Sequence, residues 1–276
     1  MIWETNEAKP AIRLITRADD CGSSHAANVA ILQSLKAGFL KNISLMACCS
    51  FIEEAAEMLA ARQDICFGLH AVLNAEWDAV KWGPVLPASQ VPTLVDENGM
   101  FMPSPQTFEI RKPNLDEIML EIQAQLDRLR ALGFRITYVD THMFPEYHVP
   151  GMEESMNEWA DKEGLLYWNR YCTTLRRVKE KPDHLLDDIL SRLVAADQGQ
   201  YLYIGHPAID TQEMRSLGNQ HISGEKLAAG RVLEAMLFTD PRILELCSKK
   251  GIVPIRYDEA LQVTEKLPPL HEWFFT

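Results

Sequence analysis

AIRLITRADDCGSSHAAN, residues 11–28, joins an apolar run to two adjacent acids, Asp19 and Asp20, and then to a helical pattern. The apolar run predicts a buried strand over residues 11–18, and the serines after the acids are residues that often begin a helix. The two acids allow two interpretations. They form either a solvated turn with a helix cap, or the base and the metal ligand of an active site.

The composition limits the classes of protein to which this chain can belong. It has 276 residues, 47% of them hydrophobic, and a net charge of −12, so we expect a single domain over residues 1–276. The acidic balance and the lack of a basic patch argue against a nucleic acid partner. The start MIWETNEAKP is polar and no window of about 18 apolar residues occurs, so we expect neither a signal peptide nor a membrane partner. Six cysteines without a CxxC motif are typical of reduced thiols in a cytoplasmic protein.

Seven strand-like runs alternate with seven helical patterns. The predicted strands are residues 11–18, 42–47, 65–71, 135–141, 164–169, 200–205 and 251–256. The predicted helices are residues 24–37, 51–62, 114–132, 151–163, 183–196, 224–238 and 240–249. The alternation predicts an α/β fold with parallel strands, in a seven-stranded or distorted TIM-type barrel. A doubly wound sheet is the alternative, but no GxGxxG motif follows the first strand. Residues 72–112 are predicted to be an insertion that lines the active-site face.

Ionisable side chains follow four of the predicted strands. They are Asp19 and Asp20, then His70, then Asp140 with His142, and finally His206. The carboxyl ends of the strands share one face of a parallel barrel, so these side chains are expected to converge. Each alone has a plainer interpretation, because an acid pair often caps a helix and a single histidine often makes a structural hydrogen bond. Together, two histidines and an aspartate can hold a divalent metal with open positions, which leaves the second acid free as a base.

Seven segments carry a family resemblance over most of the chain. In order, they are ADDCGSSHAAN, GFLKNISLMA, GLHAVLNAEW, LVDENGMF, ITYVDTHM, YIGHPAID and GRVLEAMLFTDPRI. They resemble the motifs of the YdjC-like (ChbG/HpnK) carbohydrate deacetylase family. The resemblance implies a barrel-like fold and a divalent-metal hydrolase that removes an acetyl group from an N-acetylated sugar or oligosaccharide.

The resemblance also implies a role for individual residues. Asp20, His70 and His142 are expected to hold one divalent metal ion, Mg or Zn. Asp19 is expected to be the general base that takes a proton from the water activated by the metal. His206 is expected either to assist the leaving group or to hold the tetrahedral intermediate. Arg231 and Glu234 match family positions on a helix and are interpreted as structural residues or as supports of the site. Asp140 is a candidate hydrogen-bond partner of a ligating histidine, with a hydrogen bond in a buried turn as an equal alternative.

The insertion and one later residue are the candidates for sugar binding. Trp77 and Trp82 follow His70, and an aromatic face suits the apolar face of a sugar ring, although loop packing is an equal alternative. Glu76 and Arg170 are predicted to border the pocket.

Three residues near the motifs depart from the family pattern. A longer histidine cluster is usual where this chain has DTHMFPEYH, so the role of His148 stays open, and with it activity on chitooligosaccharides. Cys21 replaces a usual phenylalanine, either as a packed small residue or as an adventitious ligand. For His25 we expect an exposed or capping position.

Other functions stay open at this point. A metal-dependent phosphoester hydrolase is one alternative, although such enzymes often use two metals and cationic residues. A non-catalytic sugar-binding barrel is the other. The apolar C-terminal stretch KLPPLHEWFFT is expected to pack either on the barrel of its own chain or on a second subunit in a homodimer.

Overall fold

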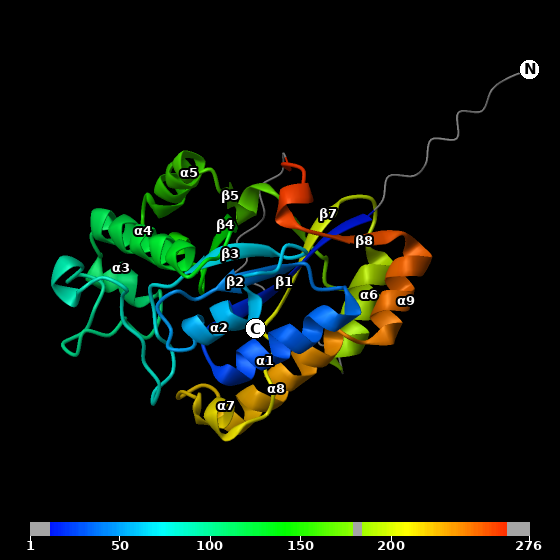
Figure 1. Ribbon diagram of the computed structural model, residues 1–276, viewed down its shortest axis with the longest axis horizontal. Helices are drawn as coiled ribbons and strands as arrows, with labels where there is room; N and C mark the ends of the chain where they lie inside the picture. The colour runs from blue at the N-terminus through cyan, green and yellow to red at the C-terminus, as the bar shows by residue number, and fades with distance from the viewer. Residues whose placement is uncertain (1–11, 179–183, 264–276) are drawn as a thin grey trace, which may run out of the picture.

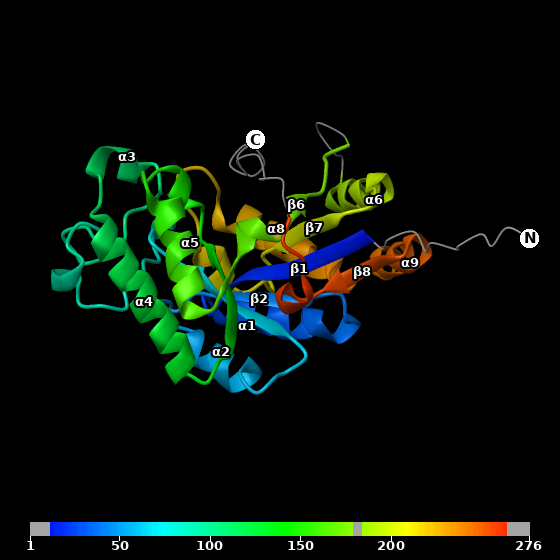
Figure 2. The same cartoon turned by 90° about the horizontal axis from the view of Figure 1, so that it is seen from above.

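The computed structural model describes residues 12–178 and 184–263, and its centre is one curled parallel sheet with helices around it (Figures 1 and 2). The strands are β1 (Ile12–Cys21), β2 (Asn42–Leu45), β3 (Cys66–Ala71), β4 (Ile136–Thr141), β5 (Leu166–Tyr167), β6 (Thr173–Thr174), β7 (Gln200–Gly205) and β8 (Ile252–Ile255). Seven of them follow the order β5-β4-β3-β2-β1-β7-β6, and β8 pairs with β1. The predicted parallel α/β architecture is confirmed. It is a distorted barrel, since β5 and β6 end the order and are not paired with each other in the described part of the chain.

Strand β1 lies at the middle of this sheet and pairs with three neighbours. Residues 13–18 pair with β7 along one edge. The other edge is shared, with β8 beside residues 12–15 and β2 beside residues 17–21. The Asn42 side chain joins the two neighbours by donating to the carbonyls of Thr16 and Ile255. The motif at the end of β1 is therefore held from both sides.

The helices cover the outside of the sheet. They are α1 (His25–Ser34), α2 (Ile52–Leu59), α3 (Thr107–Arg111), α4 (Leu115–Ala131), α5 (Met152–Glu163), α6 (Leu185–Ala195), α7 (Gln212–Ser216), α8 (Gly224–Leu237) and α9 (Pro241–Lys250). In Figure 1, α4 and α5 lie on one side of the strands and α6 and α9 on the other. The seven predicted helices occur where the periodicity indicates. The prediction omitted α3 and α7, which have five residues each, and β6, which has two, because such short elements carry no periodic signal.

Helix α4 illustrates how the sequence fixes these positions. The Asn114 side chain caps its start by accepting a hydrogen bond from the Asp116 backbone. Ile118, Ile122 and Leu126 are buried on one face of the helix. The insertion packs on the same helix, because Glu121 accepts hydrogen bonds from the backbone N–H groups of residues 85 and 86.

Some expectations concern residues outside this description. Residue 11 of the first predicted strand, residue 183 of one predicted helix, MIWETNEAKP and KLPPLHEWFFT all lie outside the described residues. No helix within residues 12–178 and 184–263 has the length and apolar character that a bilayer crossing requires.

Candidate active site

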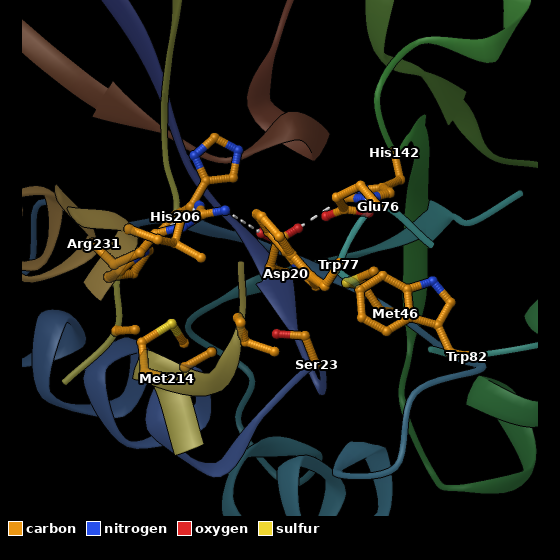
Figure 3. Close-up of a pocket in the computed structure, with 15 residues that line it drawn as sticks. Asp20, Ser23, Met46, Glu76, Trp77, Trp82, His142, His206, Met214 and Arg231 are labelled. Atoms are coloured by element: carbon orange, nitrogen blue, oxygen red, sulfur yellow. Dashed lines mark hydrogen bonds and ion pairs between the residues drawn. The ribbon is translucent and has the colours of Figure 1, made fainter. Parts of the chain in front are cut away.

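A cleft of about 990 Å³ opens at the carboxyl ends of the strands. The predicted residues that line it are Asp19, Asp20, His70, Trp77, His142, His206 and Arg231. The segment predicted to be an insertion, residues 72–112, also contributes Glu76, Asp78, Pro103, Ser104 and Gln106. The ends of four strands, helix α8 and the insertion thus build one cavity. Figure 3 shows Asp20 between Arg231 and His206 on one side and His142 and Glu76 on the other.

Both acids of the opening motif face this cleft, although neighbours on a regular strand point to opposite faces. A register shift between β1 and β2, at residues 18–21, explains this. Within it Asp20 has a φ of 64°, a left-handed conformation that is uncommon outside glycine. The acids end the strand itself, rather than forming a turn after it.

Asp20, His70 and His142 bring three ligand atoms together. His70 Nε2 lies 3.2 Å from His142 Nδ1. Asp20 Oδ1 lies 3.6 Å from the first of these nitrogens and 3.5 Å from the second. Ligand bonds of about 2.0–2.2 Å require ligand atoms roughly 2.8–3.6 Å apart at tetrahedral or octahedral angles. Asp20 Oδ1 is also buried without a hydrogen-bond partner, so the three residues fit a divalent cation.

In each imidazole, the ring nitrogen that points away from the three ligand atoms lies within hydrogen-bond distance of a carboxylate. His70 Nδ1 lies 2.6 Å from Asp140 Oδ1, and His142 Nε2 lies 3.0 Å from Glu76 Oε2. Metal-binding histidines are usually oriented in this way. The second oxygen of Asp140 accepts from Ser44 Oγ at 2.6 Å. Burial disfavours the imidazolium form of His142, but Glu76 and Asp20 outweigh it and raise its pKa to about 10.

A second group, Asp19, His70 and Asp140, also has ligand atoms within 4.8 Å of one another. Its two carboxylates are already bridged by a guanidinium. Arg17 donates to both oxygens of Asp19 at 2.7 and 2.8 Å and lies 2.7 Å from Asp140 Oδ2. A cation placed there would face this positive charge, so the group with Asp20 is the better candidate for a metal.

Arg231 and Glu234 of α8 contact two site residues directly. Arg231 NH2 lies 3.1 Å from Asp20 Oδ2. Burial favours the neutral form of Asp20, but Arg231 and the two histidines hold its pKa well below the usual range. Glu234 Oε2 accepts from the backbone N–H of His206 and lies 3.1 Å from its Nδ1. Burial raises the pKa of Glu234 to about 7, against the opposing effect of Arg231.

The three candidates for sugar binding differ in where they lie relative to the cleft. Trp77 lines the cleft. Trp82 lines the pocket beside Asp20 that Figure 3 shows, where its indole donates to the carbonyl of Asn74 and its ring packs edge-on against His142. Arg170 does not line the cleft. Its guanidinium binds Asn157 and Asp161 of α5. The prediction that Arg170 borders the pocket is wrong, because two acceptors on the neighbouring helix hold it elsewhere.

Cys21, His25 and His148 do not belong to the group of Asp20, His70 and His142 that could hold a metal. Cys21 is fully buried, with its Sγ 3.7 Å from Asn28 Oδ1. His25 is exposed, and its Nδ1 lies 2.7 Å from Glu54 Oε1. His148 pairs with Glu109 in the same way, at 2.7 Å.

Arg17 is the residue of this site that the sequence interpretation missed. It is 1% exposed. One signal was available, because a charged residue inside an apolar strand and two positions before Asp19 shares a face with that acid.

The comparisons with known proteins find matches over most of the chain. The family model described as YdjC-like protein matches residues 13–249. A carbohydrate deacetylase from Thermoanaerobacter pseudethanolicus is 27% identical over 88% of this chain and 97% of its own length. One from Geobacillus stearothermophilus is also 27% identical, over 89% of this chain and 96% of its own. Among solved structures, a candidate cellobiose-phosphate cleavage protein from Enterococcus faecalis has a TM-score of 0.73 at 22% identity, covering 91% of this chain and 100% of its own.

Proposed function

Because this chain belongs to the YdjC-like protein family, we propose that it is a carbohydrate deacetylase that hydrolyses the acetamide of an N-acetylated sugar or oligosaccharide. The observation that carries this proposal is the buried, unpartnered Asp20 Oδ1 facing two imidazole nitrogens, with the second acid, Asp19, in the same cleft. Relatives of nearly the same length are named for this activity.

Asp20, His70 and His142 are the residues that would hold a divalent metal ion. When bound, such an ion polarises the acetyl carbonyl and makes an attacking water more acidic. Two nitrogen ligands favour Zn or another transition metal, while a hard oxygen-rich environment would favour Mg. Asp140 and Glu76 keep the two imidazoles in the tautomers that present their lone pairs to the ion.

The other side chains move protons and orient the sugar. Asp19 accepts the proton of the attacking water. Breaking the C–N bond requires a proton on the departing amine, and His206 supplies it from Nε2 while Glu234 holds Nδ1 and stabilises the imidazolium. Trp77 offers an apolar face to the sugar ring.

An acetate-release assay tests the proposal. Purified protein is stripped with a chelator, reloaded with Zn, Mg, Mn or Co, and incubated with N-acetylated mono- and oligosaccharides. We expect stoichiometric acetate and free amine from at least one sugar, only with a metal present and not with Asp20→Asn. Full activity of the metal-free protein would contradict the proposed requirement for a metal ion. Release of phosphate from phosphoesters, with no acetate from any sugar, would favour the phosphoester alternative.

A further inference from the structure

Arg17 is buried beneath the cleft and contacts two different carboxylates. Its Nε and NH2 donate to Asp19 at 2.7 and 2.8 Å, in a bidentate pair. Its remaining terminal nitrogen, NH1, lies 2.7 Å from Asp140 Oδ2. The three nitrogens of one guanidinium are thus divided between the two acids.

The position of the guanidinium is itself fixed. Arg17 and Asp19 point to the same face of β1, since they are two residues apart. NH1 also donates to the Tyr257 hydroxyl at 3.2 Å, and the guanidinium carbon lies 5.9 Å from the centre of the Trp168 ring. The side chain therefore has little freedom to choose another partner.

The two carboxylates have separate tasks in the proposed function. Asp19 takes the proton from water. Asp140 is 2.6 Å from His70 Nδ1 and so turns His70 Nε2 toward the metal ligands. A displacement of either acid would misplace a reacting group or a ligand, because site geometry tolerates errors of only about 0.5 Å.

We propose that Arg17 is a positioning residue that orients Asp19 and the His70 ligand together, by holding Asp19 and Asp140 with one planar guanidinium. The proposal rests on the deacetylase function above. Lysine does not reproduce this arrangement, because an ammonium is a point charge whose donors do not form a planar fork. A purely structural Arg17 would only need to neutralise buried charge, which lysine also does.

The experiment compares Arg17→Lys with the wild type and with Arg62→Lys. Arg62 is a matched control, since it makes the same bidentate pair with the acid two residues on, Asp64, at the exposed surface. Thermal unfolding establishes that each variant folds. Co²⁺ is the probe for the metal site, through its dissociation constant and its visible absorption spectrum.

We expect Arg17→Lys to bind Co²⁺ about 10–100-fold more weakly, the usual loss when a support of a metal ligand is removed. Its spectrum should change, and kcat should fall about 100-fold or more while KM stays within about threefold. Arg62→Lys should match the wild type in every measurement. With Co²⁺ at saturation, the Arg17→Lys/Asp19→Asn double variant should lose less activity than the two single losses together, since residues that act together are not additive.

Three results would overturn the proposal. They are an unchanged Co²⁺ constant and spectrum in Arg17→Lys, a kcat within threefold of wild type, or fully additive losses in the double variant. Arg17→Gln repeats the test with a side chain that carries no positive charge. If neither Arg17→Lys nor Arg17→Gln folds, Arg17 is a structural residue and the proposal is also refuted. If the wild type releases no acetate from any sugar, the deacetylase function fails, whereas the Co²⁺ measurements still decide whether Arg17 orients the ligands.

Discussion

His70 Nε2 and His142 Nδ1 face each other at 3.2 Å, although 72 residues separate them. The pairing register of strands β3 and β4 explains why the two imidazoles lie so close. His70 pairs with Asp140 across β3 and β4, and the His142 backbone donates to the carbonyl of Ala71 at 2.9 Å. The two imidazoles point different ring nitrogens at one place, where the unpartnered Asp20 Oδ1 also lies. Three lone-pair donors so arranged are stabilised by a cation among them.

His70→Ala and His142→Ala should therefore each lose the metal. We expect about one divalent ion per chain in the wild type and little in either variant, because two protein ligands bind far more weakly than three. Elemental analysis after gel filtration checks this. His148→Ala is the control, since His148 pairs with Glu109 and should keep full occupancy. Unchanged metal in both site variants would rule out this ligand set.

The Asp19→Asn variant should still bind the metal but should have a much lower kcat. General-base catalysis contributes roughly 10²–10⁴-fold, so kcat should fall by that range while metal content stays near one per chain. Asp78→Asn is the matched control, because Asp78 lines the same cleft without contacting the three ligand residues in any described interaction. It should change kcat by less than about threefold. A near-normal rate for Asp19→Asn would remove Asp19 as the base.

The sequence predicts the fold well because long amphipathic helices and apolar strands leave periodic patterns. Helix α4 was located to within a residue at each end by Asn114 and the apolar spacing. The sequence does not predict α3, α7 and β6, since these short elements depend on tertiary contacts. The extension of β1 through Asp20 was also missed, because a register shift depends on the partner strand β2.

The candidate site was only partly predictable. Convergence of Asp20, His70 and His142 follows from their places at the ends of parallel strands. The partners of side chains do not follow, because they depend on rotamers and on neighbouring elements. Arg170 illustrates this, since α5 supplies better-placed acceptors than the cleft does. Arg17 is the converse case, a buried charge that looked like part of an apolar strand.

Glu146 should make stability depend on pH. It is 8% exposed, and both its oxygens accept from the Thr141 hydroxyl, at 2.9 and 2.7 Å. Burial, aided by the charges of Glu153 and Asp140, raises its pKa to about 7 from 4.5. The folded state thus holds the proton more tightly, so this contribution to stability is full below about pH 4.5 and is lost as pH rises through 7.

Glu146→Gln removes that titration. Relative to the wild type, the variant should gain up to about 3 kcal/mol in unfolding free energy between pH 4.5 and pH 9, at 1.36 kcal/mol per pKa unit. Urea unfolding at several pH values measures the difference. The exposed Glu154→Gln should show no such pH dependence. A constant difference between Glu146→Gln and the wild type would show that Glu146 titrates normally.

The charges of the cleft favour an uncharged sugar over a phosphorylated one. Of the described residues that line it, Arg231 is the one arginine or lysine, and it pairs with Asp20 at 3.1 Å. The nearby start of α1 offers no substitute, because Glu213 already accepts from the backbone N–H groups of His25 and Ala26. A phosphate dianion at the rim would therefore meet Glu76 and Asp78 without an arginine or lysine free to pair with it.

We accordingly expect kcat/KM for an N-acetylglucosamine disaccharide to exceed that for its 6-phosphate by about tenfold or more, mainly through KM. Acetate release from the two sugars under identical conditions measures the ratio. Added salt should bring the two kcat/KM values closer together, because salt screens charges at the open rim over distances of more than about 8–10 Å. Asp78→Asn should narrow it as well, by removing one of the repelling charges. A preference for the phosphorylated sugar would contradict this prediction and would mean that a cationic group other than Arg231 binds the phosphate.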